Sequence, residues 1–402
     1  MMAAVTPLAA FPGTADDALV QRVVAAEQPR ILRLAQAALA LPPPTITTHP
    51  ATNSAGGIHD FYSEADYSWP DFGAPHRAPY ILRDGLVNPH TFPWHRRALL
   101  DMKSGVAAFA AAYALSGDDR YPARAAEWLR VFFLDAATRM NPSLPYAQAV
   151  PGASTGNPYG IIDTLSLAEL PTAITFLDRS PAFPPAVEAG LQQWFGQYSA
   201  WLTNSPAGHA EMSNPNNHSV ALCVQLTAYA RFTGDTGLVA RVRQQYHEQL
   251  LVQQMKADGS FPHEINRSRS YHYSLFQLDN LAELCALLTE PGQDEWNFTL
   301  PDGRGFRRAL DFMYAYLLDK DRWLAAGHPR DNFHWETRPM REPALLFATA
   351  IYGDDKYFQL WLQEDESRND SASIESRRSQ GITQPILWVA RPEAVPLVKA
   401  AR

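Results

Sequence analysis

The sequence predicts an all-α protein built from helical hairpins, and three observations support this fold class. Apolar residues recur with helical spacing through most of the 402-residue chain, and strand signals are few. A short joint, in which a helix end is followed by Gly-Asp and a new helix, recurs at Gly117, Gly234 and Gly353. Because these joints are too far apart for a short-repeat solenoid, we expect a closed or nearly closed α/α toroid with an inner and an outer helix layer.

The periodicity places the expected helices in order along the chain. The first covers 17–41 and is interrupted at Pro29. Further helices are predicted at 94–117, 121–135, 161–178, 184–204, 217–233, 236–256, 272–289, 305–319 and 341–352. The segment PILWVA (385–390) is the best candidate for a strand, and the polar run 363–381 is expected to be a solvated surface loop. We expect a single domain over 1–402.

Composition excludes several classes of function. The chain is 46% hydrophobic and 19% charged, which is typical of globular proteins. With a net charge of −8 and no basic tract, nucleic acid is not an expected partner, although a local positive cleft can still bind an anionic substrate. No stretch approaches the ~20 continuous apolar residues of a membrane span. Cys223 and Cys285 lie in apolar helical stretches and are expected to be buried free thiols.

Two long non-helical stretches, 42–93 and 139–160, are rich in polar and aromatic residues. Loops of this length in a compact domain are usually functional or disordered, and the aromatic content argues against disorder. Several of the aromatic side chains could stack on sugar rings, although packing of the loops is the alternative for each of them: Tyr62, Tyr67, Trp69, Tyr80, Tyr146 and Tyr159.

The segment NPNNHSV (214–220) places three asparagines and a histidine at the start of a predicted helix. Asparagine is a preferred N-cap, but one cap needs only one side chain. We therefore expect Asn214 or Asn216 to cap the helix, while Asn217 and His218 point into a cleft.

A second motif, DGSFPHEINRSRSYHYSLFQLDN (258–280), brings arginines and tyrosines together before another helix. These residue types suit β-elimination from a uronic acid. Asn, Arg and His side chains can neutralise the carboxylate next to the C5 proton, which stabilises the developing enediolate. A tyrosine can take that proton and protonate the leaving oxygen, and a nearby arginine is expected to lower the pKa of the phenol. This set needs no metal.

The two motifs, together with SAGGIHDFYSEADYSWPD, RMNPSLPYAQAVPG and RPMREPALLFA, resemble the alginate lyase superfamily of polysaccharide lyases. The resemblance covers about 45–360 and is closest to the branch that acts on glucuronan or mannuronate-rich alginate. It implies an incomplete α/α toroid, with catalytic residues at Asn217, His218, Arg267 and Tyr273. The spacing from arginine to tyrosine is one residue shorter than in the mannuronate-specific lyases, which leaves Arg269 as the alternative catalytic arginine.

Further contacts to an anionic polysaccharide are expected from eight residues: Arg341, Arg269, His272, Tyr62, His59, Tyr146, Gln148 and Trp69. For Arg341, a structural ion pair with Glu342 or Glu336 is the alternative. The resemblance favours a periplasmic or secreted monomer. Because the chain shows no signal peptide, a leader has been removed or the protein is cytoplasmic.

Two other functions stay open at this stage. A glycoside hydrolase would need two opposed carboxylates, for which loop acids are available but not convincingly paired: Asp60, Glu64, Asp66, Asp163 and Glu264. A non-catalytic oligosaccharide-binding protein would use the aromatic loops and the arginines alone. No histidine or cysteine spacing is typical of a metal site, so neither a metal nor another cofactor is expected.

Overall fold

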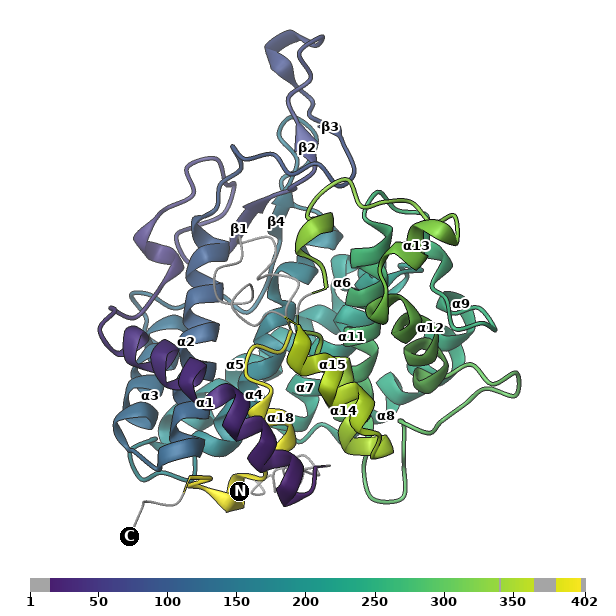
Figure 1. The fold of residues 1–402 in the computed structure, drawn as a ribbon. Helices are drawn as coiled ribbons and strands as arrows, with labels where there is room; N and C mark the ends of the chain where they lie inside the picture. The colour runs from purple at the N-terminus through teal and green to yellow at the C-terminus, as the bar shows by residue number, and fades with distance from the viewer. Residues whose placement is uncertain (1–14, 340, 365–380, 399–402) are drawn as a thin grey trace.

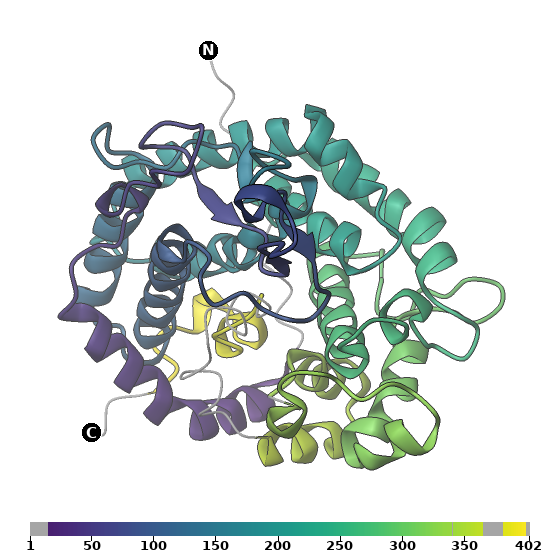
Figure 2. The ribbon, with the colours of Figure 1, turned by 90° about the horizontal axis from the view of Figure 1, so that it is seen from above.

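The computed structural model describes residues 15–339, 341–364 and 381–398, which form two concentric layers of helices (Figure 2). The inner layer consists of α2 (Trp94–Ser116), α4 (Glu169–Leu177), α7 (Asn217–Thr233), α11 (Ser270–Leu288) and α14 (Pro343–Tyr352). The outer layer consists of α1 (Asp17–Leu39), α3 (Arg120–Phe133), α5 (Pro185–Asn204), α8 (Thr236–Gln245), α12 (Phe306–Leu318) and α15 (Asp355–Gln363). The all-α toroid of helical hairpins predicted from the sequence is confirmed.

The burial of each helix explains its layer. Almost every residue of α7 and α11 is buried, whereas α3 and α12 each bury one stripe and expose the opposite face. A helix that is apolar on all sides belongs inside a protein, and an amphipathic helix belongs at its surface. The apolar composition of α2 and of 158–177 would also allow a membrane span, but 83% and 94% of these segments are buried inside the protein. Both are therefore core helices.

The Gly-Asp joints behave largely as predicted. Gly117, Gly234 and Gly353 end α2, α7 and α14 in the left-handed region, with φ of 68°, 76° and 66°. Asp235 caps α8 through the backbone N–H of Leu238, and an aspartate caps α15 in the same way. At the first joint the N-cap of α3 is Asp119, whose own side chain makes no capping bond, but the carboxylate of Asp118 accepts the backbone N–H of Arg120 at 3.0 Å.

Three local predictions were wrong. The expected strand at 385–390 is a short helix, α18 (Ile386–Val389), because its four apolar side chains are all buried and a short apolar run does not distinguish a strand from a buried helix. Pro29 does not interrupt α1, which buries Val23, Val24 and Ile31 on both sides of it. The helix expected at 161–178 begins as a 3₁₀ helix, η3 (Pro158–Ala168), and continues as α4. The polar run predicted as a loop lies mostly outside the described residues.

The remaining elements are short. Among the described residues, four strands form two small sheets: β1 (Tyr62–Glu64) pairs in parallel with β4 (Tyr146–Ala149), and β2 (Ser68–Trp69) pairs antiparallel with β3 (Ile81–Leu82). They lie in the two long loops, and residues 68–82 form an arm that projects above the ring (Figure 1). The short helices are η1 (Ile46–Thr48), η2 (Pro75–Arg77), α6 (Pro206–Met212), the π-helix η4 (Tyr246–Leu250), α9 (Leu251–Gln254), α10 (Pro262–Ile265), α13 (Asp321–Ala325), η5 (Trp335–Thr337) and η6 (Pro392–Ala394).

Buried charges hold the C-terminal segment against the inner layer. The carboxylate of Glu169 accepts the backbone N–H groups of Thr383 and Gln384, each at 2.8 Å, and pairs with Lys103 at 2.7 Å. Arg30 on α1 donates to the carbonyl of Thr383 at 2.9 Å. The segment thereby joins α1, α2 and α4. Cys223 and Cys285 are buried and free, as predicted.

Replacing Lys103 by methionine should destabilise the fold strongly. The ion pair with Glu169 is fully buried, so the change leaves an uncompensated carboxylate, and the expected loss in the free energy of unfolding is about 3–5 kcal/mol. Denaturant unfolding measures this loss. The matched control is Arg130→Met, which breaks an exposed pair with Asp135 and should cost no more than about 1 kcal/mol. Equal losses in the two variants would contradict a role for the buried pair.

Candidate functional site

Tyr273 lies in the first turn of α11, where groups from three segments meet. Its hydroxyl is 2.6 Å from the hydroxyl of Tyr67, which comes from the loop that carries the arm. The guanidinium carbon of Arg267 lies 4.4 Å from the centre of the Tyr273 ring. Only 8% of Tyr273 is exposed. A phenol, a second phenol and a guanidinium are therefore in direct contact, and the sequence predicted two of these three groups.

The pKa of Tyr273 differs from the expectation. Burial raises the pKa of this phenol well above 10, and Tyr67 adds to the increase, while Arg267 and Arg269 act in the opposite direction. The sequence correctly indicated the lowering influence of arginine but underestimated the loss of hydration, which disfavours the phenolate more strongly. Tyr273 is therefore a neutral phenol at neutral pH.

Both arginines of the second motif contact the base of the arm. Arg267 pairs with Asp84 at 2.7 Å, and Ser268 donates its hydroxyl to the same carboxylate at 2.7 Å. Arg269 donates to the carbonyl of Gly85 at 2.7 Å and is 2% exposed. Arg267, rather than Arg269, lies over the Tyr273 ring. This arrangement favours Arg267 as the arginine that acts with Tyr273.

The Asn217–His218 pair begins α7 and is backed by two buried glutamates. The backbone N–H and the side-chain amide of Asn217 donate to Glu264 at 2.7 and 2.9 Å. The Nδ1 atom of His218 lies 2.7 Å from Glu211 on α6. Asn216 is the N-cap, since its side chain accepts the backbone N–H of His218, and this confirms one of the two predicted caps. Burial raises the pKa of Glu264, and its bonds from Asn217 reduce the increase.

The short helix α10 brings the two motifs together. Glu264 belongs to this helix, and its backbone carbonyl accepts the N–H of Arg267 at 3.0 Å, three residues before α11 begins. The same residue holds the first residue of α7 through its carboxylate. The N-termini of two inner helices are therefore fixed beside each other. The partial positive charge of each is already met by a carboxylate of the protein: Glu264 accepts the backbone N–H of Asn217, and Asp331 accepts those of Tyr271 and His272 at 2.8 and 3.0 Å.

The predicted contacts on β1 and β4 are only partly accessible. Tyr62 is buried, and its hydroxyl donates to Glu64 at 3.0 Å, which indicates loop packing. Tyr146 is the strand partner of Tyr62 and is partly exposed. Gln148 has a φ of 49°, a strained value for this residue type, and its amide donates to Asp163 at 3.1 Å. Because such strain is common at functional sites, Gln148 is the strongest of these three candidates for a substrate contact.

Three other predicted substrate-contact residues have side chains that contact neighbouring groups of the protein. The indole N–H of Trp69 donates to the carbonyl of Leu86 at 2.8 Å. His59 is partly exposed, with Nδ1 at 2.7 Å from the carbonyl of Arg139. His272 is buried beside Tyr273, with ring centres 5.4 Å apart. The structure therefore brings His272 to the Tyr273 group, whereas His59 and Trp69 remain predictions for more distant contacts.

Arg341 lies elsewhere in the fold. It pairs with Glu27 on α1 and stacks at 4.3 Å over Trp361 on α15. Its side chain is 8% exposed. These contacts favour the structural alternative, with Glu27 as the partner in place of Glu342 or Glu336.

Sequence reasoning missed the groups that orient the predicted residues. Glu211, Asp84 and the Tyr67 hydroxyl had no assigned role of this kind, and Glu264 was considered only as a hydrolase acid. Asp84 is separated from Arg267 by 183 positions, so no local pattern relates them. The only signal for Glu211 is its distance of seven residues from His218, across a helix boundary.

The structure does not support an opposed pair of hydrolase carboxylates. Asp66 and Asp163 both pair with Arg96 in the interior. Asp60 accepts bonds from Gly57 and Asn141, and Glu64 and Glu264 accept the bonds described above. All five acids considered for hydrolysis are thus engaged in structural bonds.

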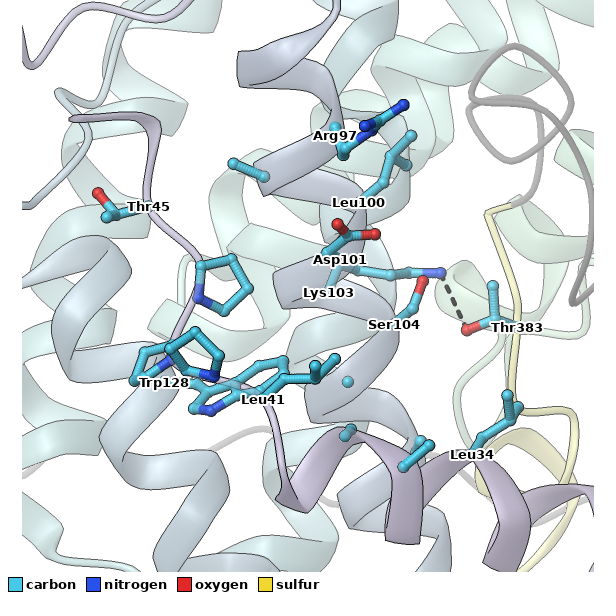
Figure 3. Close-up of a pocket in the computed structure, with 18 of the residues that line it drawn as sticks. Leu34, Leu41, Thr45, Arg97, Leu100, Asp101, Lys103, Ser104, Trp128 and Thr383 are labelled. Atoms are coloured by element: carbon cyan, nitrogen blue, oxygen red, sulfur yellow. Dashed lines mark hydrogen bonds between the residues drawn. The ribbon is translucent and has the colours of Figure 1, made fainter. Parts of the chain in front are cut away.

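A cavity of about 540 Å³ lies between α1, α2 and the loop after α1 (Figure 3). Its walls include Leu34, Arg97, Asp101 and Trp128, and Lys103 donates to Thr383 at one side. None of the candidate catalytic residues lines it. The cavity is therefore separate from the Tyr273 group, and the chemistry of the site does not depend on it.

Comparisons with known proteins agree with this geometry. Residues 45–323 match the family model described as Alginate lyase. The crystal structure of an alginate lyase from Bacteroides ovatus is similar, with a TM-score of 0.80 and 32% sequence identity over 89% of this chain and 96% of its own. No curated protein sequence matches the chain significantly.

More distant structures share the fold. A variant of alginate lyase A1-III complexed with tetrasaccharide has a TM-score of 0.53 and 18% identity over 87% of this chain and 92% of its own. Alginate lyase A1-III from Sphingomonas species A1 has a TM-score of 0.51 and 17% identity over 85% and 88% of the two chains. At these identities the likeness concerns the fold alone.

The bond between Arg267 and Asp84 predicts a pH-dependent contribution to stability. Burial would raise the pKa of Asp84, but the bonds from Arg267 and Ser268 outweigh it and lower this pKa. The contribution is therefore present above the unfolded pKa of ~3.9 and is lost as the pH falls through the lower folded value. Asp84→Asn should lose about 1 kcal/mol at pH ~7, a modest value because the pair is partly exposed. Denaturant unfolding near pH ~3 should show a smaller difference; an equal or larger one would contradict the assignment.

Proposed function

The chain belongs to the alginate lyase family and is a polysaccharide lyase, and we propose that it cleaves a 1,4-linked uronic-acid polymer by metal-independent β-elimination. The observation that carries this proposal is that Glu264 is bonded to both motifs: its carboxylate accepts the amide of Asn217, next to His218, and its carbonyl accepts the N–H of Arg267, which lies over Tyr273. Donors for a carboxylate and a phenol for proton transfer are the groups that the reaction requires.

In the proposed reaction, the amide of Asn217, the guanidinium of Arg267 and the imidazole of His218 stabilise the carboxylate of the reacting sugar. The C5–H bond breaks and the proton passes to a base, a double bond forms between C4 and C5, and the bond from C4 to the glycosidic oxygen breaks. Tyr273 returns a proton to that oxygen. The products are a 4,5-unsaturated uronate end and a new sugar hydroxyl.

The neutral state of Tyr273 suits the acid step directly, because a phenol can donate to the leaving oxygen. For the base step it must first lose a proton, and two features support this. Arg267 lies over the ring and stabilises a phenolate, and the hydroxyl of Tyr67 at 2.6 Å provides a path for the proton. When the C5 proton lies on the opposite face of the sugar, the neutral imidazole of His218 is the base and Tyr273 remains the acid.

The proposed substrates are glucuronan and mannuronate-rich alginate, and the proposed compartment is the periplasm or the cell exterior. The motifs support these substrates, and so does the similarity to an alginate lyase at 32% identity. A polymer from outside the cell would be cut in these compartments.

Tyr273→Phe should lower kcat by about 10²–10⁴-fold or more, because general acid-base catalysis of each proton step is worth that much. The absorbance of the unsaturated product on glucuronan, polymannuronate, polyguluronate and hyaluronan measures the rate. Tyr271→Phe is the matched control, because that buried hydroxyl donates to the carbonyl of Tyr316, away from the site. A Tyr273→Phe enzyme with a tenth of the wild-type kcat would reject the assignment.

Changes at the Asn217–His218 pair should separate charge stabilisation from base catalysis. Asn217→Ala should lower kcat by about 10²–10³-fold, since the stabilised charge is larger in the transition state. His218→Gln should keep partial activity on every polymer if His218 only stabilises charge. If His218 is also the base, this variant should lose activity selectively on the polymer whose C5 proton lies opposite the leaving oxygen. Wild-type rates for both variants on all four polymers would contradict the proposed site.

A further inference from the structure

We propose that two buried carboxylates, Glu211 and Glu264, fix which atoms of His218 and Asn217 are hydrogen-bond donors, and so act as positioning residues. This inference rests on the proposed function and adds a division of roles between the two residues. Glu211 and Glu264 are 0% and 1% exposed, and each reaches its partner from the interior of the protein. Neither is placed to touch a substrate, so their influence passes through His218 and Asn217.

Glu211 determines the tautomer of His218. Its Oε1 lies 2.7 Å from Nδ1, and its Oε2 accepts the amide of Asn214 at 2.7 Å. An ionised carboxylate only accepts hydrogen bonds, so Nδ1 must carry the proton. A neutral His218 then has its lone pair on Nε2. The side chain is 17% exposed, and within the described part of the chain no group is bonded to Nε2. Nε2 is therefore the nitrogen available to a substrate.

Glu264 determines the orientation of the Asn217 amide. The Nδ2 atom of Asn217 lies 2.9 and 3.0 Å from the two carboxylate oxygens of Glu264. The backbone nitrogen of Asn217 lies 2.7 Å from Oε1 of Glu264. Because the carboxylate requires donors, the nitrogen end of the amide must face it. With one N–H held by Glu264, the second N–H remains for a substrate carboxylate. A reversed amide would present its oxygen to Glu264 and repel it.

The two carboxylates therefore give Asn217 and His218 different roles. Asn217, together with Arg267, presents hydrogen-bond donors that bind the carboxylate of the substrate. A neutral His218 presents an acceptor and can receive a proton, whereas only the imidazolium, which is protonated on Nε2 as well, can stabilise the substrate carboxylate as proposed above. Tyr159 packs against the imidazole with ring centres 5.2 Å apart, and Glu264 lies close enough to interact electrostatically with both His218 and Arg267. The geometry thus makes the neutral imidazole a proton acceptor at Nε2, the nitrogen that is not bonded to Glu211.

The tautomer can be measured directly on the wild-type enzyme. Nitrogen-15 NMR of ring-labelled histidine, assigned by comparison with His218→Gln, distinguishes protonated Nδ1 from protonated Nε2 at a pH where the ring is neutral. The expected result is protonated Nδ1. Protonated Nε2 would overturn the inference, whatever the activity of the enzyme.

Two variants test the consequences for catalysis. Glu211→Gln can donate to Nδ1 as well as accept from it, so it should yield a mixture of tautomers and lower kcat by about 10–100-fold, with KM little changed. Glu264→Gln should likewise lower kcat. If Glu264 were only a nearby negative charge, its removal would lower KM and leave kcat unchanged.

The matched control is Glu248→Gln, an exposed glutamate bonded to Gln244, which should leave the NMR signals of His218 and kcat unchanged. Thermal melting shows whether each variant is folded. A folded Glu211→Gln enzyme with the wild-type tautomer and kcat would overturn the inference. If wild-type enzyme gave no unsaturated product from any of the four polymers, the proposed function would fail, while the NMR result would still decide the tautomer.

Discussion

The interaction on which the site depends is the placement of Glu264 between two inner helices. Its carboxylate binds the first residue of α7, and its backbone carbonyl accepts the N–H of Arg267 just before α11. Two motifs that are about fifty residues apart in the sequence are joined by this one residue on α10. The helices α7 and α11 also pack directly against each other, and Glu264 adds a polar link at their starts. The ring supplies rigid helices, and α10 fixes their starts relative to each other.

The long loops contribute further residues to the site that the helices form. Asp84 and Tyr67 lie at opposite ends of the segment that forms the projecting arm, and both reach the α11 motif. Gln148, on β4, is held by Asp163, which also pairs with Arg96 on α2. Functional groups on loops are common where a rigid scaffold positions them. Here the buried pair of Arg96 with Asp163 and the partly exposed pair of Arg267 with Asp84 give the loops that rigidity.

The sequence was sufficient for most of the helices, because periodicity and the Gly-Asp joints are local signals. It could not distinguish a buried helix from a strand at 385–390, since both present a short apolar run. It predicted a substrate contact for Arg341 and, as the structural alternative, partners nearby in the sequence, whereas the structure pairs Arg341 with Glu27 from the opposite end of the chain. It also underestimated burial at Tyr273, because the loss of hydration depends on packing that no spacing reveals. The orienting acids Glu211 and Asp84 escaped prediction for the same reason.

Positive and negative groups lie close together around the site, and this affects how strongly the substrate and the transition state are bound. Arg267 favours an anion, but Asp84, Glu211 and Glu264 place negative charge close to it and to the Asn217–His218 pair. Such a site attracts the carboxylate of an unreacted sugar only moderately. On proton removal, negative charge builds up on the oxygens that the oriented N–H groups face, and these short-range bonds strengthen more than the distant repulsion does. Binding energy is then expressed mainly in the transition state, which raises kcat more than it lowers KM. The buried carboxylates would therefore reduce substrate affinity and, by holding each donor in place, increase the rate of the chemical step.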